Sequence, residues 1–170
     1  ATQSNGNTRF DIMKAMQIIW LKHPDLFTWP QNDKGHLVLR LDQLAPANGF
    51  SAHNAHDALG DVEATIYLTE RIAEANPTLW QAMLNNRFRQ QSLEHLTTFK
   101  PMEMIVRYGG QVPKSIIGCY CGQVKGSNSM VGFFDLEAAS PTEIYHDEDA
   151  LREAITNSPK IIRSVNLNAI

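Results

Sequence analysis

Two side chains in the first half of the chain have the types and the spacing of an acid–base and metal-binding pair. His56 precedes Asp61 by five residues, in the stretch NAHDALGD at residues 54–61. On a regular helix the two side chains would point about 140° apart, so they converge on one substrate only where a helix begins. Histidine is the commonest general base, and a carboxylate is a hard ligand that suits Mg²⁺. The pair therefore predicts a water-activating histidine beside a metal-binding aspartate at the edge of a cleft.

The same stretch also has an ordinary structural explanation, which these residues alone leave open. Asn54 suits the N-cap of a helix, and Asp57 three residues later completes a capping box at the positive helix end. A histidine and an aspartate at such a position often do no more than cap the helix and face solvent. The pattern that follows predicts a helix over residues 55–75. Its apolar residues recur at three- and four-residue steps and predict one apolar helix face: Leu59, Val62, Ile66, Thr69 and Ala73.

The residues around the pair resemble a known enzyme family. The string NAHDAxxDVxAT, residues 54–65, resembles the last motif of the DEDDh 3′–5′ exonucleases, and within them most closely the exodeoxyribonuclease I family. Segments upstream resemble that family in the same order: TRFDI at 8–12, WPQND at 29–33 and RLDQL at 40–44. Oligoribonuclease-like and polymerase-proofreading relatives share the His-x4-Asp spacing. The segment from Trp29 to Gly49 and the second half of the chain favour exodeoxyribonuclease I over them.

The resemblance implies a function for the pair. His56 is expected to be the general base and Asp61 a ligand of catalytic Mg²⁺, in an enzyme that releases 5′-mononucleotides from the 3′ end of single-stranded DNA. Two-metal hydrolysis needs several carboxylates. In the family the others come from an Asp-x-Glu on the first strand and from a second Asp, and only Asp61 has a matching position here. We therefore expect a fragment that lacks the N-terminal catalytic motifs and the C-terminal helical region of the family. Alone, it is expected to be inactive and not to retain the Mg²⁺ of the intact enzyme.

Two other Asp-x-Glu strings occur in the chain. Asp61 and Glu63 lie on the predicted helix, where their side chains point in different directions. Asp135 and Glu137 follow an apolar strand, which is the context that the catalytic motif needs. In the family, however, this motif comes before the histidine motif, whereas here it comes after. We expect Asp135 not to be catalytic.

The residues before the motif predict helices. Thr8 and Asp11 form a second capping box, which predicts a helix through about His23 that is apolar on most sides and therefore buried. Residues 36–41 predict a short strand or the approach to the next helix. A short helix is expected over 41–45, and a longer one over 77–96.

After Pro101 the apolar period changes from that of a helix to two, which predicts strands. Expected strands are residues 104–108, 115–121, 130–135 and 161–167, with a helix over 146–156. A compact antiparallel barrel with one helix accommodates them, and the resemblance implies an SH3-like domain. We expect an α+β chain: residues 1–82 as the C-terminal helical part of a ribonuclease H-like exonuclease domain, and residues 83–170 as a small SH3-like β barrel.

Composition sets broad limits. The chain of 170 residues is 43% hydrophobic and 19% charged, as in a globular protein, and no apolar run is long enough for a membrane span. Cys119 and Cys121 are two residues apart on a predicted strand, so they share a face and do not readily close a disulfide. We expect both cysteines to be reduced and structural, as in a cytoplasmic protein. The intact protein is expected to be a monomer.

Charge is distributed unevenly along the chain. Residues 83–125 carry six basic and two acidic residues, a net charge of +4, whereas the chain as a whole carries −3. Such a segment fits a groove that binds phosphates, or an ordinary solvated surface.

The alternative to an enzyme is a non-catalytic module that binds single-stranded DNA or the acidic tail of single-stranded DNA-binding protein. Its binding residues would be Arg87, Arg89, Lys100, Arg107, Tyr108 and Lys125, the basic ones on phosphates and the aromatic one by stacking. Lys100 matches a tail-binding position of the family. His23 lies near a family arginine and Ala82 replaces a family tyrosine, and these departures weaken the prediction of tail binding. A structural protein with a chance motif is the third class.

Overall fold

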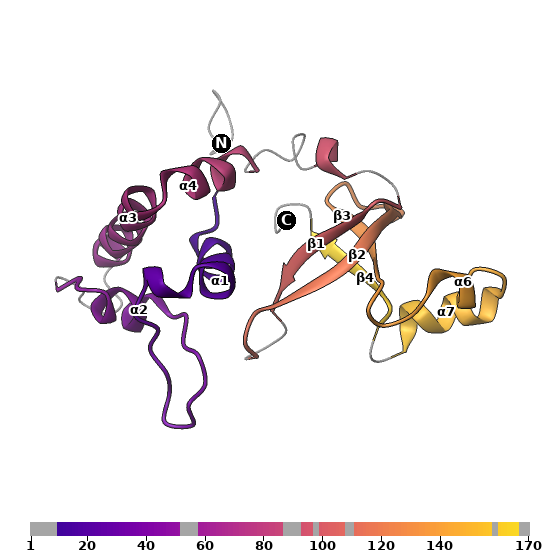
Figure 1. The fold of residues 1–170 in the computed structure, drawn as a ribbon, viewed down its shortest axis with the longest axis horizontal. Coiled ribbons are helices and arrows are strands. Elements are labelled where there is room, and N and C mark those ends of the chain that lie inside the picture. The colour runs from indigo at the N-terminus through magenta and orange to yellow at the C-terminus, as the bar shows by residue number, and fades with distance from the viewer. Residues whose placement is uncertain are drawn as a thin grey trace. The chain divides into compact units, whose positions relative to one another are not determined.

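The computed structural model describes residues 10–51, 58–86, 93–96, 99–107, 111–157 and 160–166. The chain divides into two compact units, Ala1–Asn85 with Arg107–Lys114, and Asn86–Val106 with Ser115–Ile170 (Figure 1). The first unit is helical and the second is built on a four-stranded sheet. The predicted combination of helices and an antiparallel sheet is therefore confirmed. None of the described helices is long and apolar enough to cross a membrane.

The helices of the first unit pack around one core. They are α1 (Ile12–Lys22), the 3₁₀ turn η1 (Pro24–Leu26), α2 (Leu41–Ala47), α3 (Ala58–Ala75) and α4 (Pro77–Asn85). Their shared core contains Met16 and Ile19 from α1, Leu44 from α2, and Leu68 and Ile72 from α3, all at most 2% exposed. Helix α3 contacts both α2 and α4.

Several features of the first unit differ from those predicted. Asp11, not Thr8, is the N-cap of α1, because its side chain accepts a hydrogen bond from the Met13 amide. The helix predicted over 77–96 is not continuous, because α4 ends at Asn85 and Asn86 lies in a turn; two consecutive asparagines favour turns over helix interiors. Residues 93–95 are helical, as predicted. Residues 36–41 form no regular strand and contribute only an isolated bridge between Gln31 and Leu37.

Asn48 ties the first unit together through both its side chain and its backbone. Its buried side chain accepts a hydrogen bond from the Thr28 amide (2.8 Å) and donates to the carbonyls of Thr28 (2.9 Å) and Leu44 (2.8 Å). Its carbonyl oxygen accepts from the Tyr67 hydroxyl (2.8 Å) and from Nη1 of Arg71 (3.1 Å). One residue therefore joins the loop before α2, α2 itself and α3.

We expect Asn48→Ala to lower the free energy of unfolding of the first unit by about 2–3 kcal/mol, because three hydrogen bonds lose their partner at a buried position. Urea unfolding followed by tryptophan fluorescence measures this, since Trp20, Trp29 and Trp80 all lie in the first unit. Asn85→Ala is the matched control, because the Asn85 amide is exposed and bonds only to Gln81 in the described set. Equal midpoints for the two variants would contradict the role given to Asn48.

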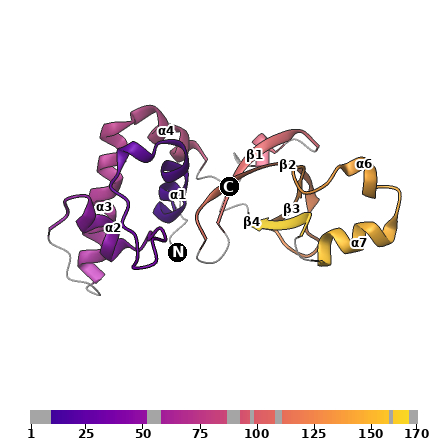
Figure 2. The same cartoon turned by 60° about the horizontal axis from the view of Figure 1, so that its bottom comes forward.

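The second unit is an open sheet. Its strands are β1 (Pro101–Val106), β2 (Lys114–Gln123), β3 (Met130–Asp135) and β4 (Ile162–Asn166), in the order β1-β2-β3-β4. The pairs β2–β3 and β3–β4 are antiparallel. Helices α6 (Pro141–Ile144) and α7 (Glu148–Thr156) connect β3 to β4 in the sequence and lie next to each other at one side of the sheet (Figure 2). The predicted closed barrel is corrected, because β1 and β4 are the two edges of the sheet among the described residues.

The two cysteines lie on β2 as free thiols. Cys119 is buried and Cys121 is half-buried. Burial raises the pKa of both thiols, and the nearby Cys119 adds to the effect on Cys121. Because only the thiolate reacts readily, labelling of Cys119 should require the second unit to open.

Candidate functional site

Asp61 lies where the motif places it, in the first turn of α3. The helix begins at Ala58 and buries the side that carries Gly60, Ala64 and Leu68. Asp61 follows Gly60 by one residue and is therefore turned away from that side, and it is exposed. Acidic residues are favoured in a first turn, where they face the positive end of the helix. The carboxylate thus lies on an open face, as a metal ligand at a cleft edge requires.

His56 lies outside the described residues, as do Asn54 and Asp57. The capping box predicted for this helix therefore stays a prediction, and so does the convergence of the His56 imidazole and the Asp61 carboxylate. Arg87, Arg89 and Tyr108 also lie outside the described residues.

The apolar face predicted for α3 is not the face that the helix buries. Leu59, Val62 and Ile66 are 62%, 54% and 51% exposed, whereas Ala64, Leu68 and Ile72 are at most 1% exposed. The helix has two stripes at helical spacing, and the one that contains the small residues Gly60 and Ala64 packs against the neighbouring helices. Small side chains allow the backbones of neighbouring helices to approach closely. The recurrence of Gly60, Ala64, Leu68 and Ile72 at four-residue steps is the sequence signal that could have identified this buried face.

The predicted DNA-binding residues that the structure describes fall into two groups. Lys100, before β1, and Lys125, after β2, are exposed. Arg107 is half-buried, and its Nε donates a hydrogen bond to the carbonyl of Gln111 (2.8 Å), which closes the loop between β1 and β2. Both predicted phosphate-binding lysines are therefore exposed to solvent, whereas the Arg107 side chain forms a hydrogen bond within the loop that follows β1.

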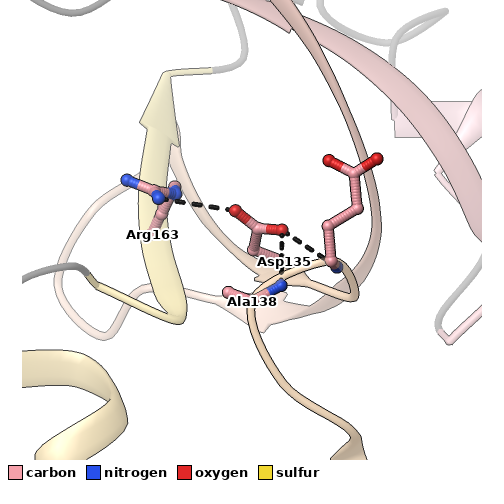
Figure 3. A network of polar contacts seen from close by, with 4 residues as sticks. Asp135, Ala138 and Arg163 are labelled. Atoms are coloured by element: carbon pink, nitrogen blue, oxygen red, sulfur yellow. Dashed lines mark hydrogen bonds and ion pairs between the residues drawn. The ribbon is translucent and has the colours of Figure 1, made fainter.

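Asp135 has a structural role that explains its Asp-x-Glu string. It is buried, and its Oδ1 accepts hydrogen bonds from the amides of Glu137 (3.1 Å) and Ala138 (3.2 Å). Its Oδ2 lies 3.4 Å from Nη2 of Arg163 on β4 (Figure 3). The Glu137 side chain is exposed. The carboxylate of Asp135 therefore holds the turn after β3 and pairs with Arg163, which supports the expectation that it is not catalytic.

The described residues contain no group of three or more His, Cys, Asp or Glu side chains that are placed to hold a metal ion. Asp61 is suited to be one ligand, because Mg²⁺ in proteins is often held by one or two carboxylates together with substrate phosphates and water. It does not make a complete site with its described neighbours.

Comparisons with known proteins bear on this arrangement. No family model matches the chain. Exodeoxyribonuclease I of Haemophilus influenzae is 33% identical over 108 residues, which are 64% of this chain and 23% of that protein. Exodeoxyribonuclease I of Escherichia coli is 33% identical over 106 residues. The chain resembles exodeoxyribonuclease I. This confirms the resemblance that the motif and its flanking segments indicated.

Solved structures of exonuclease I share the fold. The crystal structure of E. coli exonuclease I with a dA16 oligonucleotide superposes with a TM-score of 0.80 over 99% of this chain at 24% identity. The enzyme from Methylocaldum szegediense gives a TM-score of 0.78 at 26% identity. The chain covers 38% of each of these structures. It spans 22% to 27% of the length of the curated exodeoxyribonuclease I relatives that it matches.

Proposed function

We propose that this chain is part of a 3′–5′ exodeoxyribonuclease that acts on single-stranded DNA and releases 5′-mononucleotides. One observation carries the proposal: Asp61 is exposed in the first turn of α3, five residues after His56, in a chain that is 33% identical to exodeoxyribonuclease I over 108 residues. In this proposal residues 1–82 belong to the exonuclease domain and residues 83–170 to the SH3-like domain that follows it.

The proposed roles follow from the chemistry of the two side chains. His56 accepts or orients the proton of the attacking water, and Asp61 contributes an oxygen ligand at the same helix end. When bound, Mg²⁺ lowers the pKa of water and stabilises the leaving oxygen. A pair of ions needs more carboxylates than Asp61 alone supplies, so the chain by itself is inactive in this proposal. Robust Mg²⁺-dependent digestion of 3′-labelled single-stranded DNA by the 170-residue chain would contradict that part.

We expect Mn²⁺, as a paramagnetic substitute for Mg²⁺, to bind weakly at Asp61, with a dissociation constant on the order of millimolar, because few ligands converge there. Backbone NMR signals of the first turn of α3 should broaden on Mn²⁺ addition in the wild-type chain and not in Asp61→Asn. Glu63→Gln is the matched control, since Glu63 is exposed on the same helix two residues later. If Glu63→Gln removed the broadening and Asp61→Asn did not, Asp61 would not be the metal ligand.

The second candidate function is a non-catalytic module that binds single-stranded DNA or the tail of single-stranded DNA-binding protein. The exposed Lys100 and Lys125 favour it, and among the similar structures are exonuclease I with oligonucleotides and an ExoI/SSB-Ct complex. Binding driven by phosphates weakens steeply with salt. An affinity for single-stranded DNA that falls with salt, in a chain that shows no nuclease activity, is expected under both candidates. Retention of that affinity by Lys100→Ala and Lys125→Ala would exclude these lysines as the contacts.

A further inference from the structure

Phe99, just before β1, combines exposure with an unusual backbone conformation. Its side chain is 70% exposed, and its φ of 60° is the only positive value for a non-glycine among the described residues. A bulky L-residue rarely adopts this left-handed conformation, because its Cβ approaches the backbone. The residue is nevertheless held in place, since its amide donates a hydrogen bond to the Tyr120 carbonyl (2.9 Å). The fold therefore presents an aromatic ring to solvent from a fixed and strained position.

Phe99 lies at the same end of the sheet as the turn between β2 and β3. The Phe99 amide bonds to Tyr120, near the end of β2, whereas Glu103 accepts a hydrogen bond from Ser115, near its start. Strand β1 therefore starts where β2 ends and the chain enters the turn at 123–128 (Figure 1).

That turn is internally fixed and hollowed. The Gln123 side chain donates a hydrogen bond to the Ser127 carbonyl (2.9 Å), and the Ser127 hydroxyl accepts one from the Met130 amide (3.1 Å). Residues 123–128 line an open hollow of roughly 400 Å³. The hollow is shallow and polar, which suits a hydrated, extended chain better than a buried side chain.

Two exposed lysines lie near this end of the sheet. Lys100 follows Phe99 directly and Lys125 lies in the turn, and both are exposed. Residues 99–102 and 123–128 contain no Asp or Glu. An exposed aromatic ring near lysines is a combination by which proteins bind single-stranded nucleic acid without regard to sequence, with bases stacked on the ring and phosphates at the cations.

We propose that Phe99 is a stacking platform for a base of single-stranded DNA, with Lys100 and Lys125 at the flanking phosphates. The proposal rests on the proposed function and adds the residue that contacts the bases. An aromatic side chain of a peptide would need a concave apolar pocket, whereas a base needs only a flat face. The exposed ring of Phe99, at the same end of the sheet as a polar hollow, therefore favours DNA over an acidic peptide tail. The strain at φ 60° is compatible with a binding role, because binding residues often reduce stability.

The experiment compares binding of a short oligothymidylate with binding of an abasic strand that has the same number of phosphates. Phe99→Ala should weaken oligothymidylate binding by at least about fivefold, which corresponds to the lower end of base–aromatic stacking. Phe99→Trp should retain the affinity and Phe99→Leu should lose it. The abasic strand should bind equally to the wild-type chain and to Phe99→Ala. Ile155→Ala, which removes another exposed apolar side chain from the same unit, is the control and should change nothing.

A stability measurement separates stacking from a structural role. Glycine accepts φ 60° without strain, so Phe99→Gly should leave the thermal midpoint of the second unit within a few degrees while it weakens oligothymidylate binding. Salt-sensitive DNA binding that Phe99→Ala leaves unchanged would overturn the stacking proposal and leave the proposed function standing. Absence of any DNA binding would overturn both. An effect of Phe99→Ala on an acidic peptide, with none on DNA, would assign the residue to a peptide partner.

Discussion

Gly118→Ala should unfold the second unit while the first unit stays folded. Gly118 lies on β2 opposite Asp135, and a Cβ placed there would overlap the Phe134 carbonyl oxygen and the ring of Phe133, with the ring Cζ at 2.8 Å. The Phe133 ring is 1% exposed and cannot rotate away into solvent. The carbonyl oxygen is part of the neighbouring strand. Because neither group yields without a shift of β3, we expect a loss of more than about 3 kcal/mol.

The two units carry separate reporters for this test. All three tryptophans lie in the first unit and both cysteines in the second. In Gly118→Ala the Cys119 thiol, 5% exposed in the native fold, should react with a thiol reagent without denaturant, while the urea midpoint of tryptophan fluorescence stays the same. Gly126→Ala is the control. Gly126 has a φ of 80° and nothing within 4 Å of an added Cβ, so only backbone strain of about 1 kcal/mol is expected. Native protection of Cys119 in Gly118→Ala would contradict the packing of Phe133 over Gly118.

Asp135→Ala should cost the second unit about 3–5 kcal/mol, the usual effect of removing one partner of a buried ion pair. The side chains of Asp135 and Arg163 are 6% and 18% exposed. The substitution removes the carboxylate that faces the Arg163 guanidinium and also the acceptor of the Glu137 and Ala138 amides. Urea unfolding followed by thiol labelling measures the loss.

Two further variants divide that effect into its parts. Asp135→Asn keeps an oxygen for the two turn amides and removes the charge, so it should cost less than Asp135→Ala. Glu148→Ala removes the surface ion pair between Glu148, 81% exposed, and Arg152, 70% exposed. It should change stability by no more than about 0.5 kcal/mol. Equal effects of Asp135→Ala and Glu148→Ala would show that the Asp135 pair adds no more than a surface pair.

The sequence predicted elements better than their packing. The change of apolar period after Pro101 predicted all four strands close to their observed bounds, because the alternation of apolar and polar residues is a local property. Closure of the sheet depends on whether β1 meets β4, a contact between distant residues that no local pattern encodes. In α3 the residues Leu59, Val62 and Ile66 had the correct spacing for a buried face. Periodicity identifies an apolar face of a helix, but it does not show which of two such faces packs against neighbouring helices.

The candidate site shows the same division. The sequence predicted Asp61 near the start of a helix over residues 55–75, and the structure has it exposed in the first turn of α3. The use of Arg107 to close its own loop does not follow from its charge, because it depends on where the Gln111 carbonyl lies. Phe99 was missed altogether, since a lone phenylalanine before a strand normally indicates core. Only its backbone conformation and its exposure distinguish it.

The most direct test of the central claim is the activity of a chimera. In it, this chain replaces the part of E. coli exonuclease I that it matches, 38% of that chain, and release of nucleotides from the 3′ end of single-stranded DNA is measured with Mg²⁺. The chimera should be active, and His56→Ala and Asp61→Asn should each lower its rate by at least about 100-fold, as expected for a lost general base or metal ligand. Glu63→Gln should leave the rate unchanged. An active chimera whose rate survives both His56→Ala and Asp61→Asn would contradict the account.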